Sequence, residues 1–228
     1  MSTRLDRRRL AILLAAVAVF SGALIAASLA ASRGESAPAV SAPAGPAQES
    51  SFTGIPQQGA ALGDPNAEVT LVEYADLLCP YCAQWSRQAL PVLVDEYVRT
   101  GRVRIVFRGL AFLGPDSVRA LRAAVAAGRQ NRLWNVVEGL YSRQGAENSG
   151  WVSDAMLHEV AGHRAVDGSS APWIDRELTK SSKAAQAAGI AGTPAFQVGR
   201  TGGPLELVQV SSLGAEGLRP AIESALAE

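Results

Sequence analysis

The only two cysteines of the chain lie three positions apart, in the segment Cys79-Pro80-Tyr81-Cys82. Before them, residues 69–74 are apolar and rich in β-branched side chains, which is typical of a strand buried on both faces. After them, apolar residues recur at helical spacing, with polar residues on the opposite side. These apolar positions are Trp85, Ala89, Leu93 and Tyr97. The sequence therefore predicts a dithiol between the end of a strand and the start of a helix.

The predicted helix start would make one of these thiols reactive. Cys79 falls at or beside the N-cap, and Pro80 takes the first helical position, where its missing N–H costs nothing. Unpaired backbone N–H groups and the positive end of the helix dipole stabilise a thiolate there and lower its pKa. Cys82 lies one turn along and can reach the same sulfur. A static disulfide is the alternative, but closing so small a loop adds little stability.

A metal site is the second alternative for the two cysteines. His158 and His163 are the only histidines, so that together with Cys79 and Cys82 they match a Cys₂His₂ set in composition. Zinc-finger histidines follow the second cysteine within about 12–15 residues, whereas these lie far away and five positions apart. The spacing favours redox chemistry without a metal or other cofactor. A chaperone that holds copper(I) with the two thiolates alone stays open.

The N-terminal residues indicate a membrane-directed segment. Arginines cluster between positions 4 and 9, and residues 10–31 contain no charged side chain. This length matches a spanning helix of about 17–25 residues better than the apolar core of a cleavable signal, about 7–15 residues. Small residues in 28–32 leave a cleaved signal as the alternative. Because clustered arginines stay cytoplasmic, we expect residues after 31 to lie outside the cytoplasm.

Composition indicates a linker and one folded domain after this segment. Residues 32–61 are mostly Ala, Pro, Ser, Gly and Gln, which bury too little surface to offset ordering entropy, so a flexible linker is predicted. Residues 62–228 are long enough for one well-packed domain. The formal net charge of zero gives no support for nucleic-acid binding.

The order of predicted elements is βαβ, several helices, then ββα. The helix from residue 80 to about 100 contains Pro91, which should kink it. The strands at 69–74 and 103–107 should lie parallel, since a helix connects them. The remaining predicted elements are helices at about 116–132, 133–142, 153–161 and 172–188, a hairpin of 195–198 with 206–210, and a helix at 215–227.

This pattern resembles the thioredoxin superfamily, specifically its exported DsbA-like branch. The resemblance rests on the strand, the Cys-x-x-Cys at the next helix start, a helical block at about 112–189, and Gly192-Thr193-Pro194 before the hairpin. It covers about residues 63–227. It implies an α/β thioredoxin-like fold with a helical insertion, preceded here by the transmembrane or signal segment.

The resemblance also implies roles for individual residues. Cys79 would be the nucleophile and Cys82 the resolving thiol. Pro194 would be the cis-proline facing the dithiol, which exposes the backbone of Thr193 to a substrate chain. Glu73 would be a buried acid with a raised pKa that exchanges a proton with the resolving thiol.

Tyr81 departs from the best-known oxidising members, which have histidine at this position. Tyr81 cannot supply an imidazolium, so we expect a smaller depression of the pKa of Cys79 and a less oxidising disulfide. Together with Leu78 it could form an apolar surface that docks substrate, although packing at the strand end explains Leu78 equally well.

The resulting hypothesis is a membrane-tethered or exported oxidoreductase that introduces disulfides into unfolded or reduced exported proteins. A membrane partner, DsbB-like or VKOR-like, would reoxidise it. The alternatives are a disulfide isomerase or reductase of the same fold, and the copper metallochaperone.

Overall fold

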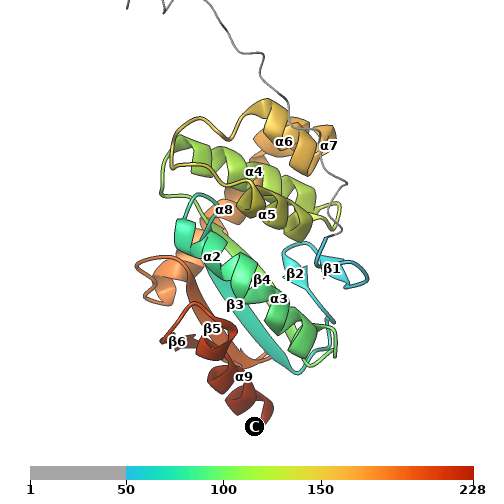
Figure 1. Cartoon of the computed structure of the whole chain (residues 1–228), viewed down its shortest axis with the longest axis vertical. Helices are drawn as coiled ribbons and strands as arrows, with labels where there is room; N and C mark the ends of the chain where they lie inside the picture. The colour runs from blue at the N-terminus through green and yellow to red at the C-terminus, as the bar shows by residue number, and fades with distance from the viewer. Residues whose placement is uncertain (1–49) are drawn as a thin grey trace, which may run out of the picture. The chain divides into compact units, whose positions relative to one another are not determined.

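A computed structural model describes residues 50–228, so the predicted segment 1–31 and most of the predicted linker lie outside the described residues. The described chain builds a six-stranded mixed sheet in the order β1-β2-β4-β3-β5-β6, with helices on both faces (Figure 1). No helix in residues 50–228 is both long and apolar enough to cross a bilayer.

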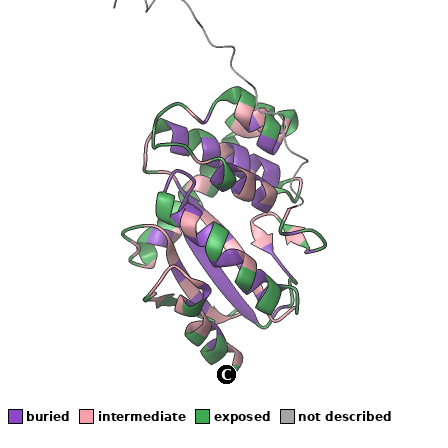
Figure 2. Cartoon of the chain, in the orientation of Figure 1, coloured by how far each residue is buried: buried purple, intermediate pink, exposed green. Residues whose placement is uncertain are grey.

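The centre of the sheet is β3 (Val69–Asp76), whose eight residues are all buried (Figure 2). It runs parallel to β4 (Val103–Leu110) and antiparallel to β5 (Ala195–Arg200), which pairs with β6 (Glu206–Val208). The predicted parallel βαβ unit and the late hairpin are thereby confirmed. Strands β3, β4 and β5 extend beyond the predicted ends.

The helix after the dithiol is broken, as the proline predicts. It consists of α2 (Pro80–Gln88), α3 (Leu90–Leu93) and a π-helical turn (Val94–Val98). The break falls at Ala89 because Pro91 has no N–H to donate to the carbonyl four residues back. On the same face of the sheet, α9 (Arg219–Leu226) follows a 3₁₀ turn (Ala215–Gly217).

The helical block lies between β4 and β5, at the predicted place. Its elements are α4 (Pro115–Gly128), α5 (Leu133–Ser142), α6 (Asp154–Ala161), α7 (His163–Asp167), a 3₁₀ turn (Gly168–Ser170) and α8 (Pro172–Ala187). Figure 1 shows α4 to α7 gathered at one end of the sheet. α8 instead packs on the sheet face opposite α2, where its Ala185 meets Val72 and Tyr74 of β3.

The predicted linker is wrong for residues 50–61, which belong to the folded domain. β1 (Gln57–Gln58) and β2 (Ala61–Leu62) form a short hairpin that pairs with β4. Phe52 is 3% exposed, and its ring meets Trp134 edge to face at 5.8 Å. The indole N–H of Trp134 donates to the carbonyl of Ala60 at 3.0 Å. Polar composition concealed this hairpin because a single aromatic and two short strands suffice to anchor the segment.

We predict that Phe52→Ala lowers the free energy of unfolding by about 3 kcal/mol, because it removes a buried ring and leaves a cavity against Trp134. Denaturant unfolding of purified protein measures this. Ser51→Ala is the control, since within residues 50–228 only the backbone atoms of Ser51 form hydrogen bonds. Equal stability of the two variants would show that the burial of Phe52 does not stabilise the fold.

Candidate active site

The dithiol lies where β3 leads into α2. Cys79 is the N-cap of α2 with extended backbone angles (φ −70°, ψ 120°), and Pro80 is in the first turn. Cys79 is 5% exposed, Cys82 is fully buried, and both are free thiols. The sulfur of Cys79 is therefore the one that a second molecule can reach.

The surroundings of Cys79 favour its thiolate. Its pKa is lowered to about 6, chiefly because the Cys82 thiol donates a hydrogen bond to it. Burial opposes this, while the Thr193 side chain and the backbone N–H groups of Cys82 and Tyr81 lower the pKa further. The depression thus occurs without the imidazolium that Tyr81 cannot provide.

Cys82 behaves in the opposite way. Its pKa is raised, first by burial and then by its hydrogen bond with Cys79 and the nearby charges of Cys79 and Glu73. At neutral pH the pair therefore consists of an accessible thiolate and a protected thiol. This asymmetry suits exchange chemistry, in which one sulfur attacks and the other resolves.

The loop before β5 faces the thiolate. The peptide bond between Thr193 and Pro194 is cis. The thiol form of Cys79 donates to the carbonyl of Thr193, with the sulfur 3.4 Å from the oxygen. The structure thus brings Cys79, Cys82, Thr193 and Pro194 together.

Glu73 lies in the middle of β3, between Phe107 of β4 and Phe196 of β5 in the sheet register. Its side chain is 1% exposed, and neither carboxylate oxygen has a hydrogen-bond partner in residues 50–228. Burial raises its pKa well above the usual range. Alternate β3 residues, Leu71 and Ala75, pack in the core cluster that contains Cys82. Glu73 is therefore a neutral acid on the side of the sheet that carries the dithiol.

Sequence reasoning missed Asp76, the last residue of β3. Its carboxylate accepts hydrogen bonds from the backbone N–H groups of Leu78 (2.9 Å), Phe112 (3.0 Å) and Leu113 (3.2 Å), and from the hydroxyl of Ser117 (2.6 Å). It joins the loop before Cys79 to the start of the helical insertion. An aspartate whose side chain binds an N–H two residues on is a turn signal that the sequence offered.

Two residues at the end of α5 also went unrecognised. Tyr141 donates its hydroxyl to the carbonyl of Asp76 at 3.2 Å. The side-chain amide of Gln144 donates to the carbonyls of Leu77 (3.0 Å) and Cys79 (3.2 Å). The insertion therefore holds three carbonyls of the active-site loop. No local sequence pattern reveals contacts across so many positions.

The exposed apolar side chains near the dithiol differ from the expected ones. Tyr81 is 61% exposed, but Leu78 is 1% exposed, so packing at the strand end accounts for Leu78 and its side chain offers no docking surface. Phe112 is 56% exposed. It lies close to the loop because its N–H and that of Leu78 bind the same Asp76 carboxylate.

The two histidines lie at the junction of α6 and α7, with ring centroids 4.2 Å apart. Across residues 50–228, no three His, Cys, Asp or Glu side chains are placed to share a metal ion. The structure therefore does not assemble His158, His163 and the two cysteines into one site.

We predict that alkylation of reduced protein by iodoacetamide follows a titration with a midpoint near pH 6, reporting Cys79. Cys82→Ala should raise this midpoint more than Cys82→Ser, because serine can still donate a hydrogen bond to the thiolate. Tyr81→Phe should leave it unchanged, since only the backbone of Tyr81 contributes. A midpoint near the ordinary thiol value of about 8.5, or equal effects of Ala and Ser at position 82, would contradict the assignment.

We predict that Glu73→Gln removes a pH-dependent loss of stability. Because the folded pKa is raised, the stabilising proton is fully present below the unfolded value of about 4.3 and is lost as pH rises towards the folded pKa. The stability difference between variant and wild type should therefore grow with pH, by at most about 1.4 kcal/mol per pH unit.

Unfolding of the oxidised protein measures this difference without titrating thiols. The matched control is Glu206→Gln, which makes the same chemical change on exposed β6. If the stability difference between Glu73→Gln and wild type did not change with pH, folding would not raise the pKa of Glu73.

Comparison with known proteins agrees with this geometry. A family model described as thioredoxin matches residues 56–203. The probable disulfide bond formation protein D of Bacillus cereus is 30% identical over 102 residues, which are 44% of this chain and 47% of the relative. The match thus spans about half the length of this relative.

Solved structures show the likeness over more of the chain. Oxidised BdbD from Bacillus subtilis has a TM-score of 0.64 at 21% identity, covering 76% of this chain and 98% of that one, which shows a shared fold. A thioredoxin-like oxidoreductase from Silicibacter pomeroyi has a TM-score of 0.61 at 30% identity, covering 74% and 92%. With the dithiol at the start of α2 and the cis-proline facing it, this chain belongs to the thioredoxin family.

Proposed function

We propose that the protein is an extracytoplasmic thiol–disulfide oxidoreductase that introduces disulfides into exported proteins through Cys79 and Cys82. The observation that carries the proposal is the opposite displacement of two neighbouring thiol pKa values, to about 6 for Cys79 and upward for Cys82. A relative named for disulfide bond formation supports the same chemistry.

The first step starts from the oxidised protein. A substrate thiolate attacks the sulfur of Cys79, and the bond between Cys79 and Cys82 breaks. The electron pair stays on the Cys82 sulfur, which takes up a proton because its pKa is raised. Glu73 is a buried acid with a raised pKa, and its ionised form would raise the pKa of the same thiol, so it is the proposed proton source.

The second step completes the oxidation of the substrate. A second substrate thiolate attacks the substrate sulfur of the mixed disulfide, and Cys79 leaves as a thiolate. A pKa near 6 makes this sulfur a good leaving group. The substrate loses two electrons, the dithiol gains them, and a DsbB-like or VKOR-like membrane partner would remove them again.

The stabilised thiolate favours the oxidising direction. A disulfide whose reduced form is stabilised is a stronger oxidant, and hydrogen bonding from Cys82, Thr193 and Tyr81 lowers the pKa of Cys79 to about 6. An isomerase or reductase would instead need a steady supply of electrons to keep the dithiol reduced. The pKa values therefore favour the oxidase among the activities of this fold.

Unfolded or reduced chains fit the surface around Cys79. Tyr81 and Phe112 expose aromatic rings near the dithiol, and the cis-proline loop presents the backbone of Thr193. An extended chain could add to that backbone as a short strand and place apolar side chains against the rings. Such contacts are tolerant of sequence, as an enzyme with many substrates requires.

A location outside the cytoplasm is part of the proposal. The arginines at positions 4–9 and the uncharged residues 10–31 support a single membrane span with the folded domain on the outer side, or export after signal cleavage. An oxidising compartment would also keep the dithiol in its working disulfide form.

We predict that the Cys79/Cys82 couple equilibrates with glutathione at a reduction potential above about −270 mV, because the thiolate is stabilised, and below about −120 mV, because no imidazolium adds to that stabilisation. Tyr81→His should make the couple more oxidising, since an imidazolium adds a further stabilising charge. A wild-type potential near about −270 mV would assign reductase work instead.

Trapping in cells is the complementary measurement. Cys82→Ala should accumulate mixed disulfides with exported proteins because the resolving thiol is missing, and the variant that also carries Cys79→Ala should accumulate none. Tight copper(I) binding by reduced protein without oxidation of a reduced substrate would favour the metallochaperone.

A further inference from the structure

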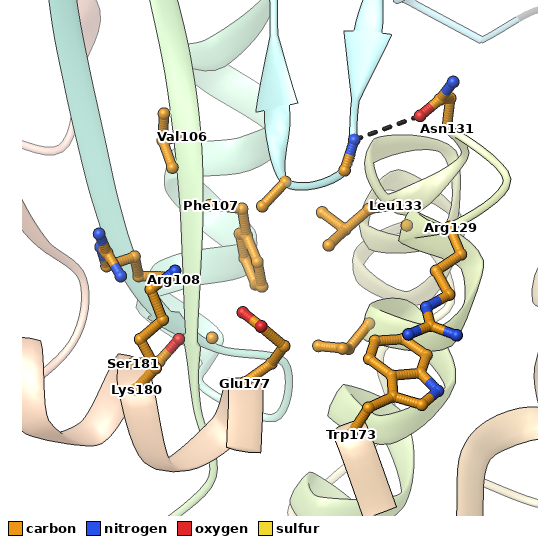
Figure 3. Close-up of a pocket in the computed structure, with 15 residues that line it drawn as sticks. Val106, Phe107, Arg108, Arg129, Asn131, Leu133, Trp173, Glu177, Lys180 and Ser181 are labelled. Atoms are coloured by element: carbon orange, nitrogen blue, oxygen red, sulfur yellow. Dashed lines mark hydrogen bonds between the residues drawn. The ribbon is translucent and has the colours of Figure 1, made fainter. Parts of the chain in front are cut away.

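A cavity of about 510 Å³ lies away from the dithiol (Figure 3). It borders residues 106–109 of β4, where the pairing of β4 with β2 ends. The turn between β1 and β2, β4, α4, the start of α5 and α8 all contribute to its walls. Neither cysteine lines it. Its volume falls in the range of small-molecule sites, about 300–1,000 Å³.

The middle of the cavity is apolar. Phe107 from β4, Val125 from α4 and Leu133 from α5 line it, together with Trp173 from the first turn of α8. At the upper end of Figure 3, the backbone N–H of Gly59 donates to the Asn131 side chain at 3.3 Å and ties the hairpin turn to the insertion. The walls therefore come from segments that are already fixed to each other.

One side of the cavity carries an oriented cation. The guanidinium of Arg129 lies over the ring of Trp173, 3.8 Å from its centroid. Stacking fixes the plane of the guanidinium and leaves the N–H groups on its edge free for an oxyanion. Arg129 forms no ion pair within the part of the chain that the structure describes.

The opposite side carries two more cations. In the view of Figure 3, Arg108 of β4 and Lys180 of α8 lie across the apolar middle from Arg129. Within residues 50–228, neither forms an ion pair with a carboxylate. In Figure 3 Glu177 lies between the two sides, and among the residues that the structure describes it is the only acidic one lining this cavity. Three cationic side chains thus flank an apolar centre, and the Glu177 carboxylate lies between them.

We propose that this cavity binds a small organic dianion whose two acidic groups are separated by a flat apolar body. One acidic group would bind the stacked Arg129, and the other would lie between Arg108 and Lys180. The apolar body would rest on Trp173 and Val125, the partly exposed apolar side chains of the cavity. Carboxylates and phosphates share the required chemistry, because both accept bidentate hydrogen bonds from arginine.

The test titrates full-length protein with rigid aromatic diacids of increasing length by isothermal calorimetry. The probes are terephthalate, naphthalenedicarboxylate and biphenyldicarboxylate, each compared with its monoacid, and phenylene bisphosphate as the phosphate arm. At least one diacid should bind about tenfold more tightly than its monoacid, since a second charge-assisted hydrogen-bonding site is engaged. Binding should weaken as salt is added.

Matched substitutions separate a site from general surface charge. Arg129→Gln and Lys180→Gln should each weaken diacid binding about tenfold. Arg132→Gln and Lys183→Gln remove the same charge from neighbouring positions outside the cavity and should change binding less than about twofold. Equal losses in all four variants, or no diacid preference at any length, would overturn the proposal.

Discussion

The buried carboxylate of Asp76 receives hydrogen bonds from both halves of the molecule. Leu78 belongs to the active-site loop, whereas Phe112, Leu113 and Ser117 belong to the entry of the helical insertion. Four donors on one carboxylate satisfy the desolvation that its burial demands. The position of the loop, and with it the N-cap sulfur, therefore depends on the docking of the insertion.

The insertion completes this support from a second direction. Tyr141 and Gln144 hold carbonyls on the loop, and Arg87 of α2 donates back to the carbonyl of Tyr141 at 2.7 Å. The cis-proline loop approaches Cys79 from the β5 side. The thiolate thus lies between elements that are distant in sequence, and its pKa reflects tertiary packing as well as the helix end.

The sequence predicted those features that local patterns determine. The β-branched run of β3, the proline break at Pro91 and the start of the helix predicted at about 153–161, where Ser153 accepts from the Met156 N–H at 3.2 Å, all follow from neighbouring residues. The β1–β2 hairpin escaped prediction because each strand has two residues and its stability comes from Trp134 and β4. The burial of Leu78 and the roles of Asp76 and Gln144 depend on contacts across the fold, which no spacing rule contains.

The zero exposure of Cys82 also bears on damage by peroxide. A low-pKa, accessible thiolate is the form that peroxide attacks, so sulfenic acid would form first on Cys79. The Cys82 thiol already hydrogen-bonds to that sulfur, and it would displace water to close the disulfide. The lesion would then be converted to the Cys79–Cys82 disulfide before reaching the irreversible sulfinic acid.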